Sequence, residues 1–152
     1  MIRPAYCLDT SILVKALVPE EGSTEAAALL RRIISGGYRL VAPSFAWAEV
    51  GAVLRKKVKA GLLSASEADV VWGRFLSLSI EYMNDEILLR AAWKIAASVS
   101  LPTLYDAAFL AAVEVCTQHS TGAIEFWTAD GELVKGLGQH IPEYVRLLQH
   151  SG

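Results

Sequence analysis

The sequence lacks the features that mark several classes of protein. No apolar run approaches the roughly 20 residues that span a bilayer, so we expect no membrane-spanning segment. No internal repeat, low-complexity tract or Pro/Ser-rich linker interrupts the chain, which predicts a single domain over residues 1–152. The two cysteines, Cys7 and Cys116, form no CxxC pair, and Asp9 comes too early for the apolar segment of a secretory leader. We therefore expect a cytoplasmic protein.

A large excess of charge of one sign is also missing. The formal net charge is −2 and the pI is about 5.9, so the protein as a whole does not attract nucleic acid or anionic membranes. Neither GxGxxG after the first apolar segment nor GxxxxGK[ST] occurs, which argues against a nucleotide-binding module. An acidic enzyme that holds metal ions can still act on an anionic substrate, because bound cations change the local field.

Apolar segments of strand length alternate with segments of helical periodicity. The apolar fraction of 53% and the mean hydropathy of +0.36 indicate a compact core. Strands are predicted at residues 5–8, 39–42, 80–83, 124–128 and 144–148. Helices are predicted at residues 10–17, 23–35, 44–60, 64–78, 85–99, 103–118 and 131–137. This alternation is typical of an α/β fold with a parallel sheet covered on both faces, in which ligands bind beyond the carboxyl ends of the strands.

Four of the sixteen acidic residues occupy positions that call for a closer look. Asp9 and Asp130 each follow a predicted strand, whereas Asp106 and Glu49 lie in helices that are largely apolar. Taken singly, Asp9 and Asp130 can be helix N-caps, and Asp106 can complement a helix dipole. Thr10 or Ser11 can also cap the first helix, which would free Asp9. Glu49 has no such role as a helix cap, because Ser44 is expected to supply the start of its helix.

Carboxylates that meet at one edge of the sheet would need protons or cations beside them. Two like charges about 4 Å apart repel by roughly 4 kcal/mol at an effective dielectric constant near 20. Carboxylates without cysteine or histidine are hard oxygen ligands, which suit Mg²⁺ or Mn²⁺. The residues alone therefore suggest a divalent-cation site formed by Asp9, Glu49, Asp106 and Asp130.

Four short motifs, taken in order, resemble a known family. They are LDTSILVK, APSFAWAEV, LYDAAFLAAVE and WTADGEL. Together they resemble the PIN-domain ribonucleases, and most closely the VapC-like toxins of toxin–antitoxin pairs, over essentially the whole chain. The resemblance implies a Rossmann-like α/β/α sandwich with a central parallel sheet. It also implies Mg²⁺- or Mn²⁺-dependent endonucleolytic cleavage of RNA, leaving a 5′-phosphate and a 3′-hydroxyl.

The resemblance also implies roles for individual residues and partners. Catalytic metal ligands fall on Asp9, Glu49, Asp106 and Asp130, and supporting hydroxyl groups fall on Thr10 and Thr128. Relatives often carry a basic or long polar residue after the last Asp; here Gly131 follows, which puts RNA contacts at that position in doubt. The family implies an RNA substrate, a homodimer and a cognate antitoxin protein that fills the groove.

Other functions compete with this interpretation. A phosphatase or dehalogenase of the haloacid-dehalogenase type also places an Asp after the first strand. That chemistry needs a second Asp two residues later, where this chain has Ser11. A catalytically inactive PIN-like module that binds RNA or a protein partner stays open, because a sequence alone does not show turnover.

Basic and aromatic residues outside the motifs allow more than one interpretation. Lys15 is either a solvated lysine or a contact to phosphate, and the basic run at residues 55–59 either complements a helix dipole or contacts RNA or an antitoxin. The tryptophans are expected in the core or at a dimer interface; they are Trp47, Trp72, Trp93 and Trp127.

Overall fold

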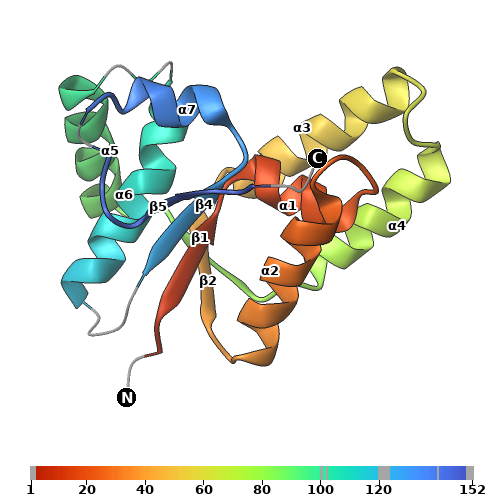
Figure 1. Ribbon diagram of the computed structural model, residues 1–152, viewed down its shortest axis with the longest axis horizontal. Helices are drawn as coiled ribbons and strands as arrows, with labels where there is room; N and C mark the ends of the chain where they lie inside the picture. Colours follow the sequence, from red (N-terminus) through yellow and green to blue (C-terminus); the bar gives the residue numbers. More distant parts are fainter. Residues whose placement is uncertain (1–2, 100, 102, 120–123, 140, 150–152) are drawn as a thin grey trace.

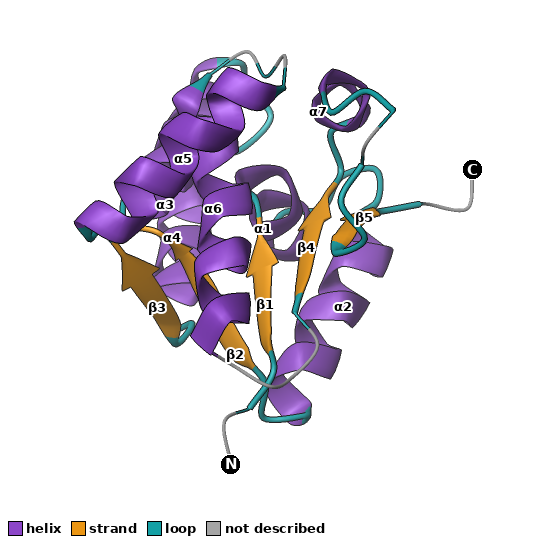
Figure 2. Cartoon of the chain, turned by 90° about the vertical axis from the view of Figure 1, so that its left-hand side faces the viewer, coloured by secondary structure: helices purple, strands orange, loops and turns teal. Residues whose placement is uncertain are grey.

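The computed structural model describes residues 3–99, 101, 103–119, 124–139 and 141–149. Within these ranges, five strands form one parallel sheet (Figure 2). They are β1 (Ala5–Leu8), β2 (Arg39–Pro43), β3 (Ile80–Met83), β4 (Glu125–Thr128) and β5 (Val145–Leu147). Their order is β3-β2-β1-β4-β5. The five predicted strands are confirmed, with only small differences at their ends.

Helices cover both faces of the sheet (Figure 1). They are α1 (Thr10–Leu17), α2 (Ser23–Ser35), α3 (Ala46–Lys59), α4 (Ala65–Leu76), α5 (Glu86–Ser98), α6 (Leu104–His119) and α7 (Gly131–Gly136). The first four lie on one side, and α5, α6 and α7 lie on the other. The predicted α/β/α arrangement is confirmed. None of the helices in the described ranges is long and apolar enough to cross a membrane.

Each face of the sheet has its own apolar core. One core joins Cys7, Val41 and Phe126 of the strands to α5 and α6. The other joins Leu8 and Leu40 to the four helices α1 to α4. The inner strands β1 and β2 are buried on both faces, which explains why their sequences are nearly continuous apolar runs that do not alternate with polar residues.

Helix α6 is apolar nearly all round because it is covered on more than one side. It packs against β1, β2 and β4 on the sheet and against α5. Residues 107–113 are therefore buried without interruption. The polar residue Asp106 lies just before this buried stretch, in the first turn of the helix. This packing fixes α6 and its first turn relative to the sheet.

Two predicted helix caps beside the acidic residues are wrong. Helix α1 is capped by the side chain of Asp9, not by Thr10 or Ser11, which lie within the helix. Helix α3 begins after Phe45 without any side-chain cap, so Ser44 does not supply its start. Glu49 therefore does have a structural explanation. It lies in the first turn of α3, where its negative charge complements the helix dipole.

Other predicted helix starts agree with the structure. The helix predicted from residue 64 begins with a capping box, in which Ser64 and Glu67 form both hydrogen bonds. The helix predicted from residue 85 is capped by the side chain of Asp85. The start of α6 was predicted at Pro102-Thr103; Pro102 lies outside the described residues, and Thr103 accepts a hydrogen bond from the first turn.

Helices α3 and α4 form a hairpin that extends away from the sheet (Figure 1). Trp47 on this hairpin is 53% exposed, and Trp93 on α5 is 67% exposed. The expectation of a core position is therefore wrong for these two tryptophans, whereas Trp72 and Trp127 are half-buried. A role for the exposed pair in a dimer interface stays a prediction.

Candidate functional site

The order of the strands creates a point where the chain changes direction across the sheet. From β1 the chain continues to β2 and β3 on one side, and it returns through α6 to β4 and β5 on the other side. Crevices at such switch points, beyond the carboxyl ends of the strands, are the usual ligand sites of parallel sheets. Asp9 directly follows β1, and Asp130 comes two residues after the end of the neighbouring β4.

Asp9 is buried and hydrogen-bonded through both carboxylate oxygens. Its Oδ1 accepts from the Ser11 hydroxyl at 2.5 Å and from the backbone N–H of Ile12 at 3.2 Å. Its Oδ2 accepts from the Thr128 hydroxyl at 2.5 Å. Ser11 in turn accepts from the backbone N–H of Ala129 at 3.0 Å. Local and tertiary contacts therefore hold this carboxylate in one orientation.

The protonation of Asp9 reflects opposing influences. Burial raises its pKa from the ordinary 3.8 to about 6, and the nearby charge of Asp130 acts in the same direction. The hydrogen bonds from Ser11, Thr128 and Ile12 lower the pKa, but they do not offset the loss of hydration. A carboxylate in this state gains stability from any cation that binds beside it.

Thr128 connects the two strand ends. Its side chain is fully buried, and its hydroxyl donates to Asp9 while accepting from the backbone N–H of Asp130 at 3.0 Å. The carboxylate of Asp130 is exposed and caps α7, accepting from the backbone N–H groups of Glu132 at 3.0 Å and Leu133 at 3.3 Å. Thr128 therefore orients the Asp9 carboxylate directly and Asp130 only through its backbone.

Glu49 lies beside the first helix. Its Oε1 accepts from the Thr10 hydroxyl at 3.0 Å, which links α3 to the start of α1. Burial raises the pKa of Glu49, the hydrogen bond from Thr10 lowers it, and the charge of Asp106 raises it further. The predicted hydroxyl position at Thr10 thus contacts one of the predicted acids.

Asp106 is half-buried in the first turn of α6. Its backbone N–H donates to the Thr103 hydroxyl at 3.2 Å, which caps the helix. Burial raises the pKa of Asp106, and the charge of Asp130 raises it further, whereas hydrogen bonding with Thr103 opposes the change. Asp106 thus interacts electrostatically with Asp130 on one side and Glu49 on the other.

The four acids form a linked series, which we call the acidic site: Asp9, Glu49, Asp106 and Asp130. The charges of Asp9 and Asp130, Asp130 and Asp106, and Asp106 and Glu49 influence one another. In donor type and charge the set fits a hard divalent cation. Within the described part of the chain, however, no three His, Cys, Asp or Glu side chains are grouped closely enough to hold a metal ion. The carboxylates would have to turn toward a common point to share one.

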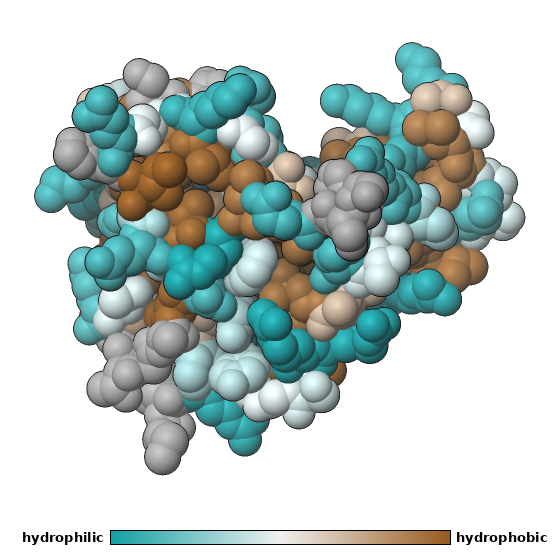
Figure 3. All heavy atoms as spheres, viewed as in Figure 1, coloured by the Kyte–Doolittle hydropathy of each residue, from teal (hydrophilic) through white to brown (hydrophobic). Residues whose placement is uncertain are grey.

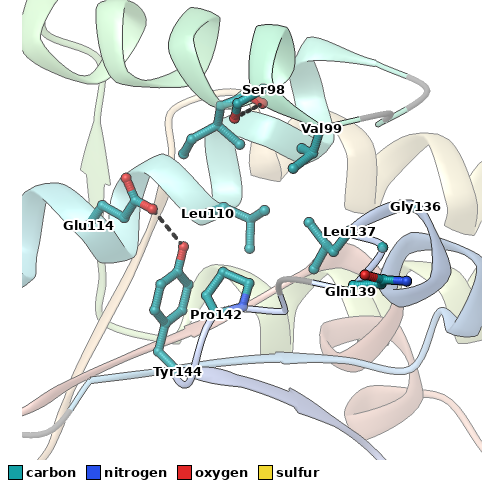
Figure 4. Close-up of a pocket in the computed structure, with 11 residues that line it drawn as sticks. Ser98, Val99, Leu110, Glu114, Gly136, Leu137, Gln139, Pro142 and Tyr144 are labelled. Atoms are coloured by element: carbon teal, nitrogen blue, oxygen red, sulfur yellow. Dashed lines mark hydrogen bonds between the residues drawn. The ribbon is translucent and has the colours of Figure 1, made fainter.

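Of two cavities in the described part of the protein, one reaches the acidic site and the other lies apart from it. A cavity of about 490 Å³ includes Thr10, Ser11 and Glu49 in its lining. Figure 3 shows a notch between the α5–α7 side and the α3–α4 hairpin, at the end of the molecule where the strands terminate. A cavity of about 630 Å³ lies between α5, α6 and α7, where Tyr144 donates to Glu114 at 3.0 Å (Figure 4). None of the four acids lines this second cavity.

Some contacts at the acidic site had no role assigned from the sequence. The sequence predicts no role for Ser11 at the site beyond a possible helix cap, yet it binds the carboxylate of Asp9 and the backbone after β4. Thr103 was considered only as a helix start, yet it also influences Asp106. The only available signal was a small hydroxyl residue within a few positions of each acid, which is common in helix starts.

Known proteins are similar to this chain in sequence and in fold. The model of the family described as PIN domain matches residues 6–135, a range that contains the four acids and both threonines of the predicted site. No curated protein matches the chain. Among solved structures, the crystal structure of PAE2754 from Pyrobaculum aerophilum matches with a TM-score of 0.56 and 21% sequence identity. The match covers 89% of this chain and 86% of that one, and at this identity it shows a common fold.

Proposed function

The chain belongs to the PIN domain family, whose members are generally nucleases, and from this premise we propose that it is a metal-dependent endoribonuclease. We infer further that it is the toxin of a VapBC-type toxin–antitoxin pair. One observation supports the proposal above all others: the buried carboxylate of Asp9 and the backbone of Asp130 meet on one hydroxyl, that of Thr128, at the switch point of the sheet.

The proposed ligands of Mg²⁺ or Mn²⁺ are the four acids. Asp9 and Asp106 would be the principal ligands, Glu49 would act directly or through water, and Asp130 would complete the set. A bound divalent cation supplies an acidified water and neutralises charge on the phosphate and the leaving oxygen. Hydrolysis in this way leaves a 5′-phosphate and a 3′-hydroxyl.

The protein's own groups prepare these carboxylates. Ser11, Thr128 and the backbone of Ile12 fix both oxygens of Asp9, so that little reorientation accompanies ligand binding. Thr10 restrains Glu49 in the same way. The raised pKa of Asp9 means that its proton must leave before the carboxylate acts as a ligand, which favours activity above about pH 6.

The proposal extends to the setting of the protein. We propose that residues 1–152 act as one nuclease domain in the cytoplasm, as a homodimer held inactive by a cognate antitoxin. The exposed Trp47 and Trp93 are candidates for these protein contacts. Expression of the wild-type chain should arrest the growth of a bacterial host, whereas Asp106→Asn should not. Equal growth with both chains would contradict the toxin role.

RNA cleavage tests the enzymatic proposal. A panel of single-stranded and structured RNAs is incubated with Mn²⁺ and the wild-type protein, Asp106→Asn, or Asp69→Asn as a matched control on α4. We expect cleavage by the wild type and the control, and none by Asp106→Asn or in the presence of a chelator. Equal cleavage by wild type and Asp106→Asn, or cleavage that survives the chelator, would refute it.

A second candidate function has a specific observation in its favour. Among the described residues, no side chains are grouped closely enough to hold a metal ion. This arrangement is compatible with a PIN-like module that has no catalytic activity. Such a module would bind RNA or a protein partner without cleaving RNA. Binding of RNA with no cleavage by the wild type under any of the metal conditions would favour this alternative.

A further inference from the structure

The cavity beside the acidic site also carries a group of basic side chains. Besides Thr10 and Glu49, it is lined by Lys15 of α1 and by Lys56 and Lys57 of α3. We call this cavity of about 490 Å³ the lysine pocket. Because Lys56 follows Glu49 by two helical turns, about 10 Å separates them along α3. The pocket therefore runs from the acidic site toward a positively charged surface.

Two of these lysines share one carboxylate. The Nζ of Lys57 lies 2.5 Å from Oε2 of Glu20, and the Nζ of Lys15 lies 3.5 Å from Oε1. Lys15 also donates to the backbone carbonyl of Glu21 at 2.9 Å. The side chains of Lys15, Lys57 and Glu20 are only 19–24% exposed. The pocket thus contains a half-buried arrangement in which two ammonium groups face a single anionic group.

We propose that the lysine pocket binds a phosphate of the RNA strand next to the one at the acidic site, and that this phosphate takes the place of the Glu20 carboxylate. The inference rests on the proposed function, and it assigns a substrate-binding role to Lys15 and Lys57. Glu20 then acts as an internal competitor: it keeps the lysines paired until the RNA backbone arrives. Lys56, which is exposed, adds a third positive charge at the opening.

Charge and position favour an RNA phosphate over other ligands. The three lysines outnumber the two carboxylates of the pocket, Glu20 and Glu49, so the pocket attracts an anion even while Glu20 is in place. The pocket shares Thr10 and Glu49 with the acidic site, so a strand with one phosphate at the carboxylates has another within reach. Each ammonium offers three hydrogen-bond donors to phosphate oxygens without any demand on base identity. The pocket is thus suited to position the strand, not to read its sequence.

Binding of RNA without cleavage tests this inference. The dissociation constant of a fluorescein-labelled single-stranded RNA is measured by anisotropy in EDTA, over a series of KCl concentrations. The variants are Lys15→Met, Lys57→Met and Glu20→Gln, with Lys94→Met on α5 as the control. We expect each lysine variant to weaken binding about tenfold. The slope of log Kd against the logarithm of the KCl concentration should fall in magnitude by about 0.7, which is the contribution of one phosphate contact to a single strand. Glu20→Gln should tighten binding, and Lys94→Met should change nothing.

Two further variants separate binding from folding. Lys57→Arg keeps the charge and should retain the binding that Lys57→Met loses, and urea unfolding shows whether each variant is folded under the assay conditions. If the folded lysine variants bind RNA as tightly as the wild type, the inference is wrong while the proposed nuclease function stands. An acidic segment of a protein partner would then be the better ligand for the pocket. If the wild type binds no RNA in EDTA, the inference is wrong, and cleavage of RNA with Mn²⁺ decides separately whether the proposed nuclease function stands.

Discussion

Asp9 and Asp130 follow neighbouring strands and both cap a helix, yet their environments differ greatly. Asp9 is 6% exposed, accepts hydrogen bonds from Ser11 and Thr128, and has a pKa raised to about 6. Asp130 is exposed, and among the described residues its carboxylate accepts hydrogen bonds only from the backbone of α7. The same local pattern, an acid between a strand and a helix, thus produces a constrained buried group in one case and a solvated group in the other. The difference lies in what the rest of the fold places around each acid.

Cleavage activity should show the largest difference between the two acids. Asp9→Asn removes the charge of the buried ligand, and we expect the RNA cleavage rate to fall on the order of a hundredfold or more. Asp130→Asn retains the cap and should reduce the rate by only about tenfold, because the exposed group can be replaced by water. Rates are measured with Mn²⁺, with Glu132→Gln as a control in the same turn of α7. Equal losses in the two Asn variants would remove the distinction between the two acids.

The second largest difference between the two acids should appear in the pH dependence of the free energy of unfolding. The pKa of Asp9 is about 6 in the folded protein instead of 3.8, so the folded state holds the proton more tightly. The resulting stability is fully present below about pH 3.8 and is lost as the pH rises through about 6, a difference of about 3 kcal/mol. Denaturant unfolding from pH 4 to 7 should show this decline in the wild type and in Asp130→Asn, but less of it in Asp9→Asn. If the stability of Asp9→Asn declined with pH as steeply as that of the wild type, the decline would come from other titratable groups.

Thr128 is the link between the two acids, and its loss should have a smaller effect. Thr128→Val removes the hydrogen bond to Asp9 and leaves the backbone N–H of Asp130 without its acceptor, at a cost of about 2 kcal/mol in the free energy of unfolding. The pKa of Asp9 should rise further, because one hydrogen bond that lowers it is lost. Thr128→Ser keeps the hydroxyl and serves as the control. If the valine and serine variants unfold alike, the hydroxyl does not stabilise the acidic site.

The capping role of Asp130 should give the smallest effect. Asp130→Ala removes the acceptor for two N–H groups at the start of α7, which should lower stability by about 1 kcal/mol. Asp130→Asn should change stability by less than half of that, because Asn caps helices about as well. Thermal unfolding of the two variants side by side measures the difference. A larger loss in the Asn variant would mean that the charge itself stabilises the fold.

Much of the fold could be predicted from the sequence, because the relevant signals are local. The strands are short apolar segments, and the capping box at Ser64 is contained within four residues. The cap of α1 differs from the prediction for a physical reason: several residues near its start can accept the same N–H groups, and tertiary contacts choose among them. Ser11 illustrates this choice, because its hydroxyl donates to Asp9 two residues earlier and accepts from the backbone N–H of Ala129, which follows β4. At α3 no side chain takes the capping position, so the local pattern at Ser44 is not used.

The candidate site could be predicted only in part. The order and spacing of the motifs selected four acids that the structure links electrostatically at the carboxyl ends of the strands. The exposure of Asp130 and the pairing of Lys57 with Glu20 depend on how segments far apart in the sequence pack, and no local pattern encodes them. The same holds for Trp47 and Trp93, whose apolar neighbours in the sequence suggested burial.

Binding of Mn²⁺ tests the central claim, that the four acids act together as one cation site. Isothermal titration calorimetry is carried out on the wild type, Asp9→Asn, Asp106→Asn and the control Glu132→Gln, each confirmed as folded by its urea unfolding transition. The account predicts saturable binding to the wild type and to Glu132→Gln, and its loss in both aspartate variants although these lie on different elements. Binding to Asp9→Asn and Asp106→Asn with the affinity and stoichiometry of the wild type would contradict it.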